Sequence, residues 1–84
     1  MALTFPNRSR SYDAAGRRIR FVGYDGMFEV AFFVEAGAIA KASLNEAGYL
    51  DAFDAARTSI QNVARQVYAN SRKNMHVLTS ADFR

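Results

Sequence analysis

Residues 18–34, with the sequence RIRFVGYDGMFEVAFFV, decide the fold. In this stretch an Asp25-Gly26 pair separates two runs in which apolar residues recur at every second position. Alternation with a period of two is typical of strands that bury one face, and Asp-Gly is a favoured two-residue loop of a β-hairpin. The stretch therefore predicts an antiparallel hairpin with Asp25 and Gly26 in its turn.

This turn also predicts a register for the hairpin, because a two-residue loop sets Tyr24 opposite Met27. A slip of one residue would move every apolar side chain to the other face, so the separation of the two faces supports the pairing. The predicted inner pairs are Gly23 with Phe28, Phe21 with Val30, and Ile19 with Phe32, and the predicted outer pairs are Val22 with Glu29, Arg20 with Ala31, and Arg18 with Phe33.

A second hairpin is predicted upstream, closed around Ala15-Gly16. It sets Asp13 opposite Arg18, which is a favourable cross-strand charge pair. The same register sets Tyr12 opposite Ile19 and Arg10 opposite Phe21. An arginine on the apolar face is tolerable near the edge of a sheet, so we expect this strand at an edge.

The pattern becomes helical after Val34. Residues 35–42 form a short alanine-rich segment, and Ser43 with Glu46 matches a Ser-x-x-Glu capping box at the start of a second helix. From there to about Asn70 the apolar residues follow helical spacing, which predicts one continuous helix of roughly 37 Å. Residues 75–79 then form a short last strand. The predicted apolar stripe of the long helix contains Leu50, Phe53, Ala56, Ile60, Val63, Val67 and Tyr68.

The fold class that these elements predict is α+β: a two-layer domain with a mainly antiparallel sheet of three to four strands and two helices packed on one face. The length of 84 residues predicts a single domain over residues 1–84. Half of the residues are hydrophobic and 23% are charged, which is globular composition. The chain has no cysteine, so neither a disulfide nor a thiolate metal site can stabilise so small a core.

Several short motifs resemble those of the domain of unknown function 1488 family, a group of small bacterial proteins. They are Phe5-Pro6, Ile19-Arg20-Phe21, Asp25-Gly26, Ala52-Phe53, Arg57-x-x-Ile60 and Leu78-Thr79-x-x-Asp82-Phe83. The resemblance covers nearly the whole chain and implies an antiparallel sheet with helices packed on it. It implies no activity. Where relatives often carry a histidine before the helix arginine, this chain has Ala56, so any role of that histidine is absent here.

The sequence predicts no enzyme and no cofactor. Nucleophilic catalysis needs a nucleophile beside a base, yet His76 is the only imidazole and no Gly-x-Ser-x-Gly elbow occurs. Zinc-type sites need three or four ligands at short spacing, and no such cluster of histidine and acids occurs. The glycines form no phosphate-binding loop at the start of a helix.

Arginines are the best candidates for surface binding. Residues 1–20 contain five arginines and a single acid, Asp13. Arg18 and Arg20 share the outer sheet face with Phe33, an arrangement that can bind phosphates and stack a base. The alternative is a solvated face on which Asp13 pairs with Arg18 and Glu29 pairs with Arg20. Arg57 at the margin of the helix stripe is a further candidate, or else it pairs with Asp54 or Asp82.

We therefore expect a small accessory or protein-interaction module, with weak nucleic-acid binding through the arginine-bearing face as the alternative. A homodimer is a further candidate, because Val22, Met27, Ala31 and Phe33 share the outer face; alternatively, the segment around Leu3 and Phe5 covers that face. We expect no membrane partner, since the longest apolar run is Val30–Val34. The first residues do not resemble a signal peptide, which predicts a cytoplasmic protein.

Overall fold

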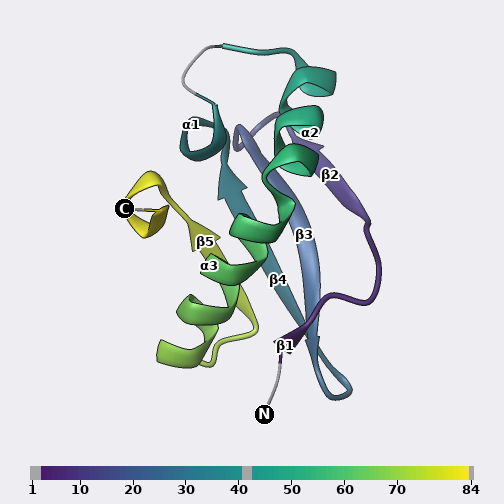
Figure 1. Cartoon of the computed structure of the whole chain (residues 1–84), viewed down its shortest axis with the longest axis vertical. Helices are drawn as coiled ribbons and strands as arrows, with labels where there is room; N and C mark the ends of the chain where they lie inside the picture. Colours follow the sequence, from purple (N-terminus) through teal and green to yellow (C-terminus); the bar gives the residue numbers. More distant parts are fainter. Residues whose placement is uncertain (1–2, 41–42, 84) are drawn as a thin grey trace.

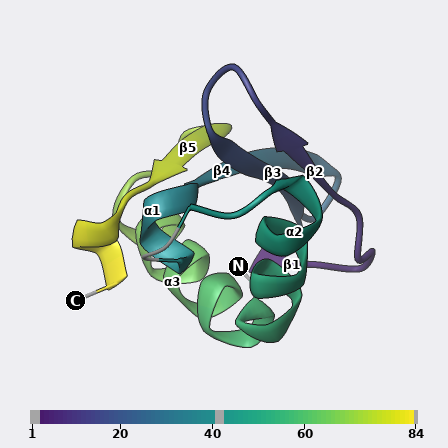
Figure 2. The same ribbon diagram turned by 90° about the horizontal axis from the view of Figure 1, so that it is seen from above.

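The computed structural model describes residues 3–40 and 43–83. Its strands form one five-stranded sheet, and the three α-helices lie against one face of that sheet (Figures 1 and 2). The predicted two-layer α+β architecture is confirmed. In chain order the elements are β1 (Leu3–Thr4), β2 (Arg10–Asp13), β3 (Arg18–Asp25), β4 (Phe28–Glu35), α1 (Ala36–Ile39), α2 (Glu46–Ala55), α3 (Arg57–Asn70), β5 (Met75–Leu78) and the 3₁₀ helix η1 (Ser80–Phe83).

The central hairpin forms as predicted, but its turn lies one residue later. Asp25 pairs with Phe28, so the loop is Gly26-Met27 rather than Asp25-Gly26. Gly26 has a φ of 63°, and glycine with positive φ at the first loop position is the signature of a type II′ turn. The predicted register is therefore wrong by two residues. A two-residue shift leaves every side chain on its predicted face, so Phe21 and Val30 still share the inner face.

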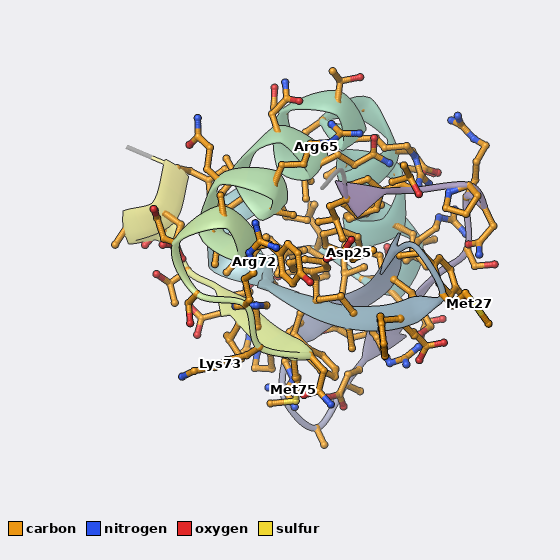
Figure 3. The ribbon with its side chains drawn as sticks, turned by 90° about the horizontal axis from the view of Figure 1, so that it is seen from below. Asp25, Met27, Arg65, Arg72, Lys73 and Met75 are labelled. Atoms are coloured by element: carbon orange, nitrogen blue, oxygen red, sulfur yellow. The ribbon has the colours of Figure 1, made fainter. Side chains whose placement is uncertain are left out.

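The shift has a physical cause at Asp25. This residue belongs to β3, where it pairs with Leu3, and only 7% of it is exposed. Its carboxylate accepts a 2.7 Å hydrogen bond from the Tyr68 hydroxyl on α3. In Figure 3, which looks onto the end of the molecule that carries the turn, Asp25 lies near the centre of the view and Met27 at its margin. A buried carboxylate needs a donor, and the strand position provides one that a turn position would not.

The strands on either side of the central hairpin form largely as predicted. The pairing of β2 with β3 matches the predicted register, including Asp13 opposite Arg18 and Arg10 opposite Phe21. The last strand also forms, and it pairs in parallel with β4, which makes the sheet mixed. Leu3 and Phe5 pack against the core on the helix side. The suggestion that they cover the outer face is therefore wrong.

Two predictions about the helices need correction. The capping box at Ser43 is wrong, because Asn45 is the N-cap residue of α2 and its side chain accepts a 2.8 Å hydrogen bond from the Gly48 amide. The single long helix is also wrong, because it is interrupted at Ala56, whose φ and ψ are −104° and 12°. The bend changes the direction of the helical segment and leaves Phe53 and Ile60 fully buried on either side of it (Figure 1).

The core lies between the helices and the inner face of the sheet. Aromatic rings form its centre, with Phe21 stacked on Phe32 and tilted against Phe53. The predicted stripe contributes Phe53 and Ile60 as fully buried residues, and Tyr49 and Ala64 join them without having been predicted. This one layer of contacts holds all the fully buried side chains of the described residues.

The helix packing gives a direct test. Ile60→Asp places an unpaired charge at a site with no exposed surface, so we expect a loss of about 3–5 kcal/mol from a total of roughly 5–10 kcal/mol. Asn62→Asp on the exposed side of the same helix should change stability by less than about 0.5 kcal/mol. Thermal and denaturant unfolding of both variants measure the difference. Equal stabilities would contradict the assignment of the buried stripe.

Candidate functional site: the open face of the sheet

The sheet face opposite the helices carries no covering layer in the described part of the chain (Figure 2). We call it the open face. Strand alternation assigns its side chains, since Ile19, Phe21 and Phe32 point to the core and their neighbours point outward. The open face consists of Arg18, Arg20, Val22 and Tyr24 of β3, Glu29, Ala31 and Phe33 of β4, and Met75 and Val77 of β5.

The predicted apolar group on this face is present with one exception. Val22, Ala31 and Phe33 lie there and are half-buried by their neighbours. Met27 instead lies in the turn and is 96% exposed. Strand β5 adds Met75 and Val77, whose place on this face was not predicted. The alternation of Met75 and Val77 with His76 and Leu78 is visible in the sequence, but the sequence does not show that this strand pairs with β4.

Arg18 is held at two points. Its Nε donates to Asp13 Oδ2 at 3.1 Å, and its guanidinium lies over the Phe33 ring, 4.1 Å from the centroid. The hydrogen bond from Arg18 lowers the pKa of the Asp13 carboxyl below its usual value, with help from the Gly16 amide. The cross-strand pair predicted from the sequence thus fixes Arg18 against the aromatic ring.

Arg20 also has an acidic neighbour. Its Nη2 lies 3.8 Å from Glu29 Oε2, and the Tyr24 hydroxyl donates to the other oxygen of Glu29 at 3.4 Å. Both side chains of this ion pair are about half exposed, so the contact is solvated and weak. The predicted pairing of Arg20 with Glu29 is nevertheless present. Both arginines of the open face therefore have a carboxylate within reach.

Arg57 lies on the other side of the sheet, in a cluster with Arg10 and Asp54. Arg10 donates through Nε and Nη2 to the two carboxylate oxygens of Asp54, at 3.0 and 2.9 Å. Arg57 Nη2 donates to Asp54 Oδ1 at 2.7 Å and to the Arg8 carbonyl at 3.1 Å. Of the four predicted binding residues, the structure brings Arg18, Arg20 and Phe33 together and separates Arg57 from them.

The Arg10–Asp54–Arg57 cluster has a structural role. Arg57 is 9% exposed, packs over Phe53, and its Nε has no hydrogen-bond partner among the described residues. The cluster ties the chain just before and within β2 to the junction of α2 and α3. The predicted pairing of Arg57 with Asp54 is present, whereas Asp82 instead accepts from the Thr79 amide.

The single histidine is part of the packing. His76 is 7% exposed, stacks on Phe32 with ring centroids 5.4 Å apart, and has Nε2 3.0 Å from the Lys73 carbonyl oxygen. Over residues 3–40 and 43–83 no group of three or more metal-ligating side chains gathers. In the same residues no helix has the length and apolar character needed to cross a membrane.

The Arg10–Asp54–Arg57 cluster should make stability depend on acid. Hydrogen bonding from Arg10, then from Arg57, lowers the pKa of Asp54 in the folded protein. Its contribution is therefore present above the unfolded pKa of about 4 and is lost as the pH falls through the lower folded pKa. Asp54→Asn should flatten this part of the acid-unfolding curve. Asp51, on the exposed side of the same helix, makes no hydrogen bond to the cluster, so Asp51→Asn should change the curve much less, and equal curves for the two variants would contradict the assignment.

Comparison with known proteins adds the family. No curated protein and no solved structure matches the chain. The family model described as "Protein of unknown function (DUF1488)" matches residues 3–78, which include every strand and α-helix described above. The match confirms the resemblance seen in the short motifs. The chain belongs to the DUF1488 family.

Proposed function

We propose that this protein is a small accessory module that binds another protein through the open face of its sheet. The observation that carries the proposal is that helices cover one face of the sheet and leave the other open. One face holds the whole core, and the other presents Phe33, Val22 and Ala31 half-buried beside Met75 and Val77, which are 51% and 38% exposed. Contiguous apolar surface on a small domain is typical of an interaction site.

The distribution of charge on the open face supports the same role. The Arg18–Asp13 pair lies at one end of its apolar side chains, and the Arg20–Glu29 pair spans the row of Val22 and Ala31. Protein interfaces combine apolar and polar side chains, and arginine is enriched in them. Arg18 is also held over Phe33, which leaves an aromatic and a guanidinium group pre-positioned for a partner.

A binding role without catalysis fits the engaged state of the reactive side chains. His76 is buried against Phe32 and Tyr68 and contacts the Lys73 carbonyl. The phenol of Tyr68 donates to Asp25, and this hydrogen bond raises the pKa of Tyr68. These groups stabilise the end of the core nearest the central turn, and none of them lies on the open face.

The open face gives a first test. Phe33→Glu should abolish capture of a protein partner from a lysate of the source cells, because it places a charge at the centre of the apolar surface. Phe28→Glu is the matched control: it also replaces a phenylalanine of β4, but that residue is 77% exposed and its side chain lies on the other side of the strand. Partner capture by mass spectrometry, with unfolding curves for both variants, separates loss of binding from loss of fold. Equal capture by Phe33→Glu and the unmodified protein would contradict the proposal.

Nucleic-acid binding through Arg18, Arg20 and Phe33 is the alternative, favoured by the cation–π contact of Arg18 with Phe33. The neighbouring carboxylates compete with phosphates for both arginines, which is why we prefer a protein partner. The alternative predicts that replacing both arginines with alanine lowers the slope of log affinity against log salt by about 1.5–2. Fluorescence anisotropy with single-stranded and duplex probes measures this slope. Absence of binding at about 50 mM salt would eliminate the alternative.

A further inference from the structure

Strand β5 is one edge of the sheet. The Ala31 amide donates to the Asn74 carbonyl at 2.9 Å, so the backbone groups of residue 74, and of residue 76 two positions later, point toward β4. The N–H and C=O groups of Met75 and Val77 must then point away from the sheet. These two residues form a template to which another strand can hydrogen-bond.

The two edges of the sheet differ in how they are protected. The opposite edge is divided between the two-residue β1 and the four-residue β2, with Pro6 in the connection and charged residues at both ends of β2. Proline, charge and short strands are the devices that prevent pairing at an edge. Strand β5 reads Met-His-Val-Leu and contains no proline, lysine or acid. Its two outward-facing residues also have exposed side chains, Met75 at 51% and Val77 at 38%.

We infer that β5 pairs antiparallel with β5 of a second copy of the chain, around a twofold axis that passes beside His76. This inference concerns self-association at the edge and does not depend on the partner proposed for the open face. A twofold axis at His76 sets Met75 opposite Val77 of the second copy, and Val77 opposite Met75. Both positions carry outward backbone groups, so each such pair exchanges two hydrogen bonds.

The side chains fit the same arrangement. Met75 and Val77 project from the open face, and directly opposite residues in an antiparallel pair have Cβ atoms about 5 Å apart. The four apolar side chains of the two copies therefore cover one another at the junction. The methionine side chain is flexible, so it can fill the irregular space beside the β-branched Val77 of the other copy.

Charge at the two ends of β5 selects the antiparallel direction and an identical partner. Around the same axis Lys73 lies opposite Thr79 of the second copy. The Asp82 carboxylate is fixed at Thr79, where Oδ2 accepts from the amide at 2.9 Å and lies 3.4 Å from the hydroxyl. Figure 3 shows Lys73 and Met75 at the same margin of the molecule. Parallel pairing would instead bring Lys73 beside Lys73. The strand is thus basic before its start, acidic after its end, and complementary to itself when reversed.

The expected dimer is weak, because a short paired edge buries less than the about 1,200 Å² at which stable interfaces begin. Sedimentation equilibrium from about 5 to 200 µM should show reversible monomer–dimer association with a dissociation constant on the order of tens of micromolar. Amide exchange at Met75 and Val77 should slow over the same range of concentration. A monomer throughout this range, with unchanged exchange at both amides, would overturn the inference.

Three variants identify the surface. Val77→Pro removes an outward donor without removing a bond to β4, and should weaken association at least about tenfold, whereas the isosteric Val77→Thr keeps the donor and should change it by less than about threefold. Lys73→Glu should weaken association, and Arg8→Glu, a charge-matched change at an exposed site away from β5, should not. If Phe33→Glu dissociates the dimer and Val77→Pro does not, the copies meet through the open face and the edge pairing is wrong. Because exchange is measured on the unmodified chain, a variant that fails to fold does not remove the test.

Discussion

Pairing of β3 with β4 along all eight residues of each strand is the constraint on which the rest of the molecule depends. It places alternate side chains on opposite faces of the sheet, and the side chains of one face form the sheet side of the core. β1 and β2 then share the remaining edge of β3, and β5 takes the remaining edge of β4. A chain of 84 residues provides helices enough to cover a single face, so the same pairing that creates the core also creates the open face.

The sequence predicted faces more reliably than partners. Ile19, Phe21 and Val30 are buried on the face assigned to them, although their cross-strand neighbours differ from the prediction. Sliding one strand by two residues leaves the alternation unchanged, so the hydrophobic pattern does not distinguish the two registers. The distinction comes from the bond between Asp25 and Tyr68, two residues far apart in the chain. Local turn chemistry allows both loops, Asp25-Gly26 as a type I′ turn and Gly26-Met27 as a type II′ turn, so it does not choose between them.

The helix break at Ala56 has a similar origin. Alanine is the best helix former, so nothing in the local sequence predicts an interruption there. The residues on either side explain it, because Asp54 and Arg57 are both tied to the chain before and within β2 through Arg10 and the Arg8 carbonyl. At the start of α2, the residue that caps the helix is Asn45 and not the predicted Ser43. At Ala56 tertiary contacts override local propensity, whereas the Asn45 cap is itself a local hydrogen bond.

Part of the candidate site could be predicted from the sequence, because alternation along a strand assigns side chains to faces. Arg18, Arg20 and Phe33 were assigned to one face from alternation alone, and the acids near both arginines were identified from the predicted sheet. Met75 and Val77 were missed because their place depends on a parallel pairing of β5 with β4 across the three intervening helices. Such a pairing leaves no signal in the residues between.

That parallel pairing also affects the order in which the sheet can assemble. The hairpins of β2, β3 and β4 join neighbouring segments, and hairpins of this kind close in about 1–10 µs. β5 meets β4 only after the intervening helices have brought it back, so its pairing carries a larger loss of chain entropy. Until it arrives, the backbone of β4 is itself an open edge, with Phe32 and Val34 not yet covered by their neighbours in β5. We therefore expect the chain to be most vulnerable to aggregation in the interval before β5 docks, when the open edge of β4 can pair with other chains.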